Sequence, residues 1–128
     1  MKIAFDTNII VRMITLDDES RLKKIISLLE KHSTKDIFIS YGVLIETFYV
    51  LTKKYNFSKA KALDAFEDLL KIEHFTFEQD TAVRLALAKS KKGIEFNDAL
   101  IGEIGAVKNL KTYTLDKGLK NNTSFEIL

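Results

Sequence analysis

The sequence predicts an α/β fold, a three-layer α/β/α sandwich whose central sheet is mostly parallel. Short apolar runs with strand character alternate with longer segments of helical periodicity from one end of the chain to the other. This alternation is typical of βαβ units, whose right-handed crossovers place helices on both faces of a parallel sheet. The length of 128 residues, without a linker or an internal repeat, predicts a single domain over residues 1–128.

Turn residues and helix caps set the bounds of the expected elements. The run over 2–5 is stopped by Asp6-Thr7-Asn8, which predicts a strand and then a loop. Further strands are expected over 36–40, 74–77, 111–115 and 125–128. Helices are expected from the caps Asp17 or Asp18 to His32, over 41–54, from Ser58 to about residue 70, over 80–91 before Gly93, and from Asn97 or Asp98 to about residue 107.

The composition is globular and excludes several classes of protein. Hydrophobic residues make up 46% of the chain and charged residues 30%. The absence of cysteine excludes a disulfide scaffold, a cysteine nucleophile and a thiolate metal site. A net charge of +2 does not by itself indicate nucleic-acid binding. No segment has the ~18 apolar residues of a membrane span, and the charged start of the chain is unlike a signal peptide, so we expect a cytoplasmic protein.

Four acidic residues hold positions where α/β sheets place their sites. Asp6 follows the first strand, Asp116 follows the strand over 111–115, Asp98 begins a helix, and Glu46 lies in the helix after the second strand. If they converge, their mutual repulsion requires a cation. Oxygen ligands select Mg²⁺ or Mn²⁺, and such ions suit the hydrolysis of a phosphodiester.

Each acid also has a purely structural interpretation. Asp6 and Asp98 are possible helix caps, and Asp116 with Gly118 is a possible turn. Glu46 lies in an apolar stretch, and a buried acid without a partner would be costly. If its face of the helix is exposed, Glu46 needs no partner and has no special role. Their joint placement favours a metal site.

The segments Asp6–Arg12, Glu95–Ile101 and Thr114–Asp116, with Glu46 between them, resemble the PIN-domain ribonucleases. Within these ribonucleases, the toxins of VapBC-type toxin–antitoxin modules are the most similar branch. The resemblance covers nearly the whole chain, with the segments in the same order. It implies a PIN-like fold, an endoribonuclease that depends on Mg²⁺ or Mn²⁺, a homodimer, and an antitoxin that covers the site.

Matched by position, the resemblance implies that Asp6, Glu46, Asp98 and Asp116 form a catalytic, metal-binding quartet. It also implies supporting residues near the quartet. The hydroxyl of Thr114 would orient a ligand or bind the metal through water, Asn8 is the polar residue beside the first acid, and Glu95 is an additional acid where the family often has Asp.

Three basic residues are candidates for contacts with substrate phosphates, namely Arg12, Lys117 and Lys120. The structural alternative for Arg12 is an ion pair with Asp17 or Asp18. The alternative for the two lysines is a solvated surface.

The leading hypothesis is therefore a metal-dependent endoribonuclease that acts on RNA as the toxin of such a pair. Two other functions stay open at this point. One is an RNA-processing nuclease without an antitoxin, and the other is an interaction module with a catalytically silent acidic pocket.

Overall fold

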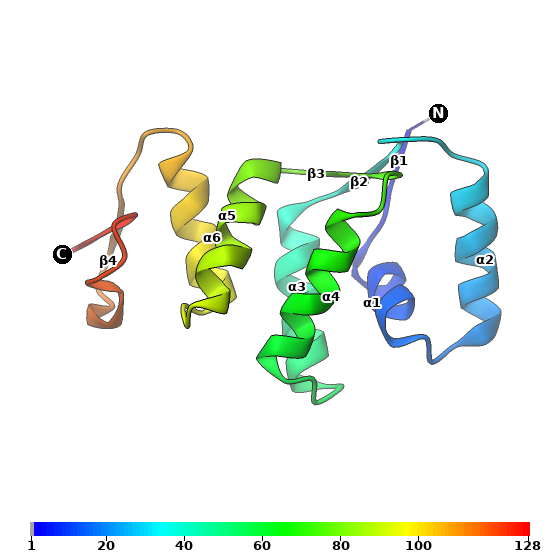
Figure 1. Ribbon diagram of the computed structural model, residues 1–128, viewed down its shortest axis with the longest axis horizontal. Helices are drawn as coiled ribbons and strands as arrows, with labels where there is room; N and C mark the ends of the chain where they lie inside the picture. Colours follow the sequence, from blue (N-terminus) through cyan, green and yellow to red (C-terminus); the bar gives the residue numbers. More distant parts are fainter. Residues whose placement is uncertain (1) are drawn as a thin grey trace. The chain divides into compact units, whose positions relative to one another are not determined.

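The computed structural model describes residues 2–128 and divides into two compact units (Figure 1). The first unit reaches to Glu78, and the second runs from Gln79 to Leu128. Each unit combines helices with parallel strands. None of the helices formed by residues 2–128 is long and apolar enough to cross a membrane.

The first unit is built on a three-stranded parallel sheet in the order β1-β2-β3. The strands are β1 (Ile3–Ala4), β2 (Ile37–Ile39) and β3 (Phe75–Phe77). Ile37 and Ile39 of the central strand are completely buried, which is why this short apolar run is recognisable in the sequence. The three strands predicted for this part of the chain are confirmed with narrower bounds.

Two pairs of helices connect these strands. α1 (Thr7–Thr15) and α2 (Glu19–Glu30) lie between β1 and β2, and α3 (Tyr41–Lys53) and α4 (Lys59–Leu70) lie between β2 and β3. The predicted caps are confirmed for α2 and α4. Asp18 and Ser58 each accept a hydrogen bond from the backbone N–H three residues further on. Ser40 caps α3 in the same way.

The loop predicted after the first strand is wrong, because residues 7–15 form helix α1. Asp6 caps this helix, Ile10 and Val11 are buried, and the helix packs against α3. Thr, Asn and β-branched residues are poor helix formers in isolation. Tertiary contacts and the cap therefore outweigh the local propensity here.

The second unit joins two helices to a pair of parallel strands. Its elements are α5 (Asp80–Lys91), α6 (Phe96–Ala106), β4 (Thr112–Thr114), the short 3₁₀ helix η1 (Lys117–Leu119) and β5 (Phe125–Ile127). Gly93 follows α5 with a φ of +112°, as expected for a glycine that ends a helix. The expected start of α6 at Asn97 or Asp98 is too late, because the helix begins at Phe96.

A buried polar network ties these elements together. Lys89 of α5 forms an ion pair with Glu103 of α6, whose side chain is only 6% exposed. Ser124, just before β5, accepts a hydrogen bond from Lys89 Nζ at 3.2 Å and donates one to Glu103 Oε1 at 3.2 Å. Asn122 Oδ1 accepts from the backbone N–H of Ser124 at 2.9 Å. The network thus fixes the C-terminal segment against both helices.

Gly102 allows β5 to lie close to α6. A Cβ at this position would lie 2.6 Å from Cε2 of Phe125, a buried ring with little room to move. We therefore expect Gly102→Ala to lower the free energy of unfolding by about 1–3 kcal/mol, as measured by urea denaturation. Gly42→Ala is the matched control, because its Cβ meets only Ser40 Oγ at 3.8 Å. It should be neutral or stabilising by up to ~1 kcal/mol, as expected for Ala in a helix. Equal stability of the two variants would contradict the prediction.

Candidate active site

The first predicted acid, Asp6, lies at the end of β1 and is exposed. Its Oδ1 accepts a hydrogen bond from the backbone N–H of Ile9 at 3.2 Å, so it caps α1 as the structural alternative proposed. Its Oδ2 has no hydrogen-bond partner within residues 2–128. A cap and a ligand role are compatible, since the cap uses one oxygen and leaves the other available.

Glu46 lies in α3, which follows the neighbouring strand β2, and its side chain is exposed. The argument that a buried acid must have a partner therefore does not apply to it. The buried face of α3 is formed by residues such as Leu44, Thr47 and Leu51. Because β1 and β2 are parallel neighbours, Asp6 and the start of α3 follow the same edge of the sheet.

In the second unit, burial and two nearby acids act on the carboxyl of Asp98. Asp98 lies half-buried in the first turn of α6, and burial raises its pKa, with further contributions from the negative charges of Asp116 and Glu95. The structural interpretation of Asp98 as a helix cap is wrong, because Glu95 lies at the N-cap position of α6. This arrangement favours a cation, because a positive charge would relieve the repulsion.

Hydrogen bonds within the segment after β4 fix the position of Asp116. Its backbone N–H donates to Thr114 Oγ1 at 3.0 Å, and its Oδ1 accepts from the N–H of Gly118 at 2.8 Å. The predicted turn of Asp116 with Gly118 is confirmed. The Thr114 hydroxyl thus holds the backbone that carries the acid. Its supporting role at a metal or ligand stays a prediction.

The quartet is divided between the units, with Asp6 and Glu46 in the first and Asp98 and Asp116 in the second. Within either unit, over residues 2–128, no three acidic or histidine side chains are close enough together to hold a metal ion. The convergence of all four acids stays a prediction. The donor set itself, carboxylate and hydroxyl oxygens, fits Mg²⁺ or Mn²⁺.

The predicted basic residues have different environments. Arg12 Nη1 lies 3.0 Å from Asp17 Oδ1 and donates a hydrogen bond to the Tyr55 hydroxyl at 3.0 Å. Its structural alternative, an ion pair with Asp17, is therefore confirmed. Lys117 and Lys120 are exposed in and just after η1, next to Asp116, where their charges remain available to an anionic ligand.

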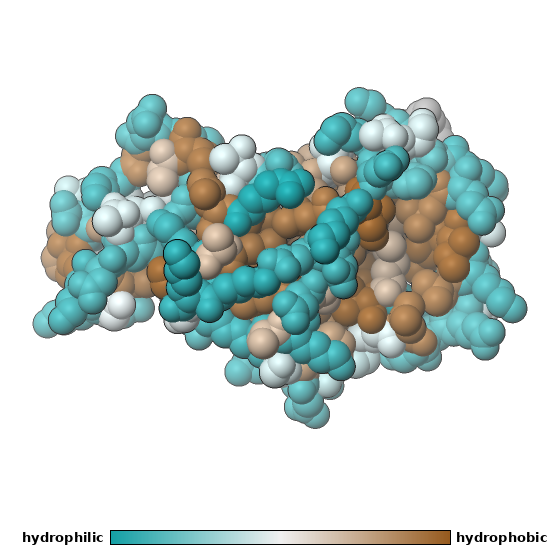
Figure 2. Space-filling view, in the orientation of Figure 1, coloured by the Kyte–Doolittle hydropathy of each residue, from teal (hydrophilic) through white to brown (hydrophobic). Residues whose placement is uncertain are grey.

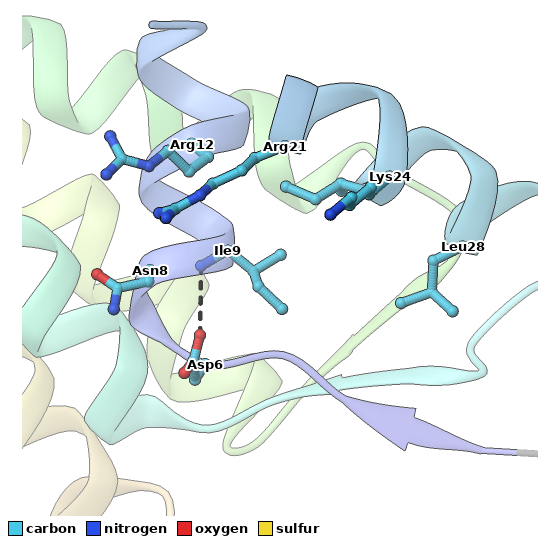
Figure 3. A pocket seen from close by; sticks show the side chains of 8 residues that line it. Asp6, Asn8, Ile9, Arg12, Arg21, Lys24 and Leu28 are labelled. Carbon is cyan, nitrogen blue, oxygen red and sulfur yellow. Dashed lines mark hydrogen bonds between the residues drawn. The ribbon is translucent and has the colours of Figure 1, made fainter. Parts of the chain in front are cut away.

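A cavity of about 360 Å³ lies between α1 and α2 (Figure 3). Asn8, the polar residue predicted beside the first acid, contributes to its wall. Sequence analysis gave no role to Arg21 and Lys24, which line the same cavity. Helical spacing could have indicated that these residues share a surface. Residues at intervals of three and four lie on one face of a helix, as do Arg21, Lys24, Ile25 and Leu28 of α2.

Acidic side chains that follow parallel strands are typical of proteins whose site lies at the carboxyl edge of an α/β sheet. Among families of this class, the PIN domain matches residues 3–123. The chain belongs to the PIN domain family, whose members are generally nucleases. The predicted fold class, a PIN-like α/β fold with parallel strands, is confirmed by this match.

Two solved structures are similar to the chain. One is the VapBC2 complex of Rickettsia felis bound to a DNA fragment from its promoter, with 22% identity over 100% of this chain and 98% of that one, at a TM-score of 0.41. The other is a toxin–antitoxin complex from Klebsiella pneumoniae, with 16% identity over 100% of this chain and 96% of that one, at a TM-score of 0.36. No curated protein matches the chain significantly.

The repulsion around Asp98 predicts a stability that depends on pH. A raised pKa means that the folded chain holds this proton more tightly than the unfolded chain. Stability therefore falls as pH rises from the ordinary value of 3.8 through the raised pKa. We expect Asp98→Asn to raise the melting temperature at about pH 7 in EDTA, and this gain to vanish at about pH 3, where the carboxyl is protonated in both states.

Thermal unfolding followed by circular dichroism measures this difference. Asp80→Asn is the matched control, because Asp80 also lies in the first turn of a helix but forms an ion pair with Arg84 at 3.1 Å. It should give no gain at either pH. A gain for Asp98→Asn that is independent of pH would show that charge repulsion is not its cause.

Proposed function

We propose that this PIN-domain protein is an endoribonuclease that hydrolyses RNA with the help of Mg²⁺ or Mn²⁺. The observation that carries the proposal is the match of the PIN domain to residues 3–123. It is supported by Asp98, whose pKa is raised first by burial and then by the negative charges of Asp116 and Glu95. Hydrolysis by metal-activated water also agrees with the composition, because the chain has no cysteine and only two histidines.

In this proposal residues 1–128 act as one nuclease domain, and Asp6, Glu46, Asp98 and Asp116 hold the metal. When bound, the ion supplies a Lewis acid that polarises the phosphodiester and lowers the pKa of water. Thr114 positions Asp116 through its backbone N–H. Glu95 adds negative charge at the same place, Asn8 stands beside the first acid, and Lys117 and Lys120 attract the RNA backbone.

We further propose that the protein is the toxin of a toxin–antitoxin pair, that it forms a homodimer, and that it acts in the cytoplasm. The support is the ordered set of segments that resembles the VapBC-type toxins, from Asp6–Arg12 to Thr114–Asp116. A small protein encoded next to this chain that co-purifies with it and stops cleavage would support the pairing. Cleavage without any such partner would instead favour an RNA-processing nuclease.

Loss of one acid should abolish catalysis while the fold survives. We expect Asp6→Asn and Asp98→Asn each to reduce the cleavage of total RNA in Mn²⁺ by at least ~100-fold, since a bound metal contributes several kcal/mol to transition-state stabilisation. Asp80→Asn, an exposed acid on α5, should cleave like the unmodified protein, and EDTA should stop all activity. Wild-type rates for either site variant would disprove the assignment.

Metal binding is measurable without any RNA. A cation that binds only the folded chain stabilises it by mass action, so millimolar Mn²⁺ should raise the melting temperature of the wild type. Asp98→Asn should reduce this shift, whereas Asp80→Asn should retain it. The absence of a shift in the wild type would favour the interaction module with a silent acidic pocket.

A further inference from the structure

The cavity between α1 and α2 combines an apolar floor with a basic rim (Figure 3). Ile9, Ile25 and Leu28 provide the apolar surface, and brown apolar residues face the hollow between the two helices in Figure 2. Arg21 and Lys24 extend from α2 toward α1, and Asp6 lies at the start of α1. The cavity thus adjoins one of the proposed metal ligands.

Cations outnumber acids in the lining, and two of them are ion-paired, Arg12 with Asp17 and Arg21 with Asp18. Three of its residues are cations (Arg12, Arg21 and Lys24), and Asp6 is the only acid. Arg21 forms an exposed ion pair with Asp18 at 3.3 Å, which orients its guanidinium but is screened by water. Lys24 has no ion pair within residues 2–128. Its charge is therefore available to a ligand.

The basic surface continues along α2 away from Asp6. A second hollow of about 420 Å³ is lined by Lys23, Lys24, Ser27, Leu28 and Lys31, so it shares Lys24 and Leu28 with the cavity. The 12 residues of α2 span about 18 Å. The lysines Lys23, Lys24 and Lys31 extend over about 12 Å along this helix, enough to contact successive phosphates of one extended strand.

We propose that this α1–α2 groove binds the single-stranded RNA segment that adjoins the scissile phosphate, an inference that rests on the proposed function. Arg21, Lys24 and Lys31 contact phosphates, while Ile9, Ile25 and Leu28 receive the face of a base or ribose. A single strand fits because its unstacked bases can turn an apolar face toward the protein. The unpaired lysines favour a polyanion over an apolar peptide as the occupant.

The test measures binding without cleavage. The probe is a fluorescein-labelled single-stranded RNA of mixed sequence in EDTA, followed by fluorescence anisotropy over a range of salt concentrations. The double variant Arg21→Gln/Lys24→Gln should weaken binding about tenfold or more at low salt. It should also make the dependence of log K on log salt shallower by about 1.4, since each phosphate contact in a single strand contributes ~0.7.

The matched control is Lys53→Gln/Lys54→Gln, which removes the same charge from exposed positions at the end of α3. It should leave the affinity within about twofold and the salt slope unchanged, because counterions are released only where phosphates are contacted. An equal loss in both double variants would show a general effect of net charge and would overturn the assignment to the groove.

Two further outcomes also overturn the inference. One is the absence of RNA binding by the wild type itself. The other is wild-type RNA affinity in Arg21→Gln/Lys24→Gln, and if this variant also loses a co-purifying protein partner, the groove is a protein-docking surface. Cleavage of total RNA by the wild type in Mn²⁺ is scored separately, so failure of the groove and failure of the nuclease assignment are distinguishable.

Discussion

The ion pair between Lys89 and Glu103 is the interaction on which the second unit depends. It joins α5 to α6, and through Ser124 it holds the C-terminal segment against both helices. Loss of Lys89 would leave the charge of Glu103, which is only 6% exposed, without compensation by an ion pair. The strand β5 held by this network pairs with β4, which leads directly to Asp116. The network therefore supports the strand pair that leads to Asp116.

The repulsion around Asp98 is maintained at the expense of stability. Burial and the charges of Asp116 and Glu95 raise the pKa of Asp98, whereas hydrogen bonds from Thr15 and Arg12 lower the pKa of Asp17. Natural proteins tolerate such local conflicts mainly at functional sites. Thr114 and Gly118 fix the backbone and one oxygen of Asp116 by hydrogen bonds, so the acids cannot relax apart without breaking local structure. A cation would convert this stored repulsion into binding energy.

Much of the fold was predictable from the sequence because its signals are local. The buried runs around Ile37 and Phe75 identify strands, and Asp18, Ser58 and Gly93 mark helix ends through caps that act within a few residues. Helix α1 was missed because its stability comes from contact with α3, which no local pattern of propensity encodes. In the same way, helical spacing places Arg21 and Lys24 on one face of α2. Only the fold shows that this face meets α1.

The two acids of the first unit are exposed, whereas Asp98 of the second unit is half-buried. Asp6 and Glu46 are exposed, and Asp6 already satisfies one oxygen by capping α1. The positive end of that helix favours a carboxylate at the position of Asp6. Asp98, by contrast, is destabilised by burial and by its neighbours. A cation would therefore relieve more unfavourable charge beside Asp98 than beside the exposed carboxylates of the first unit.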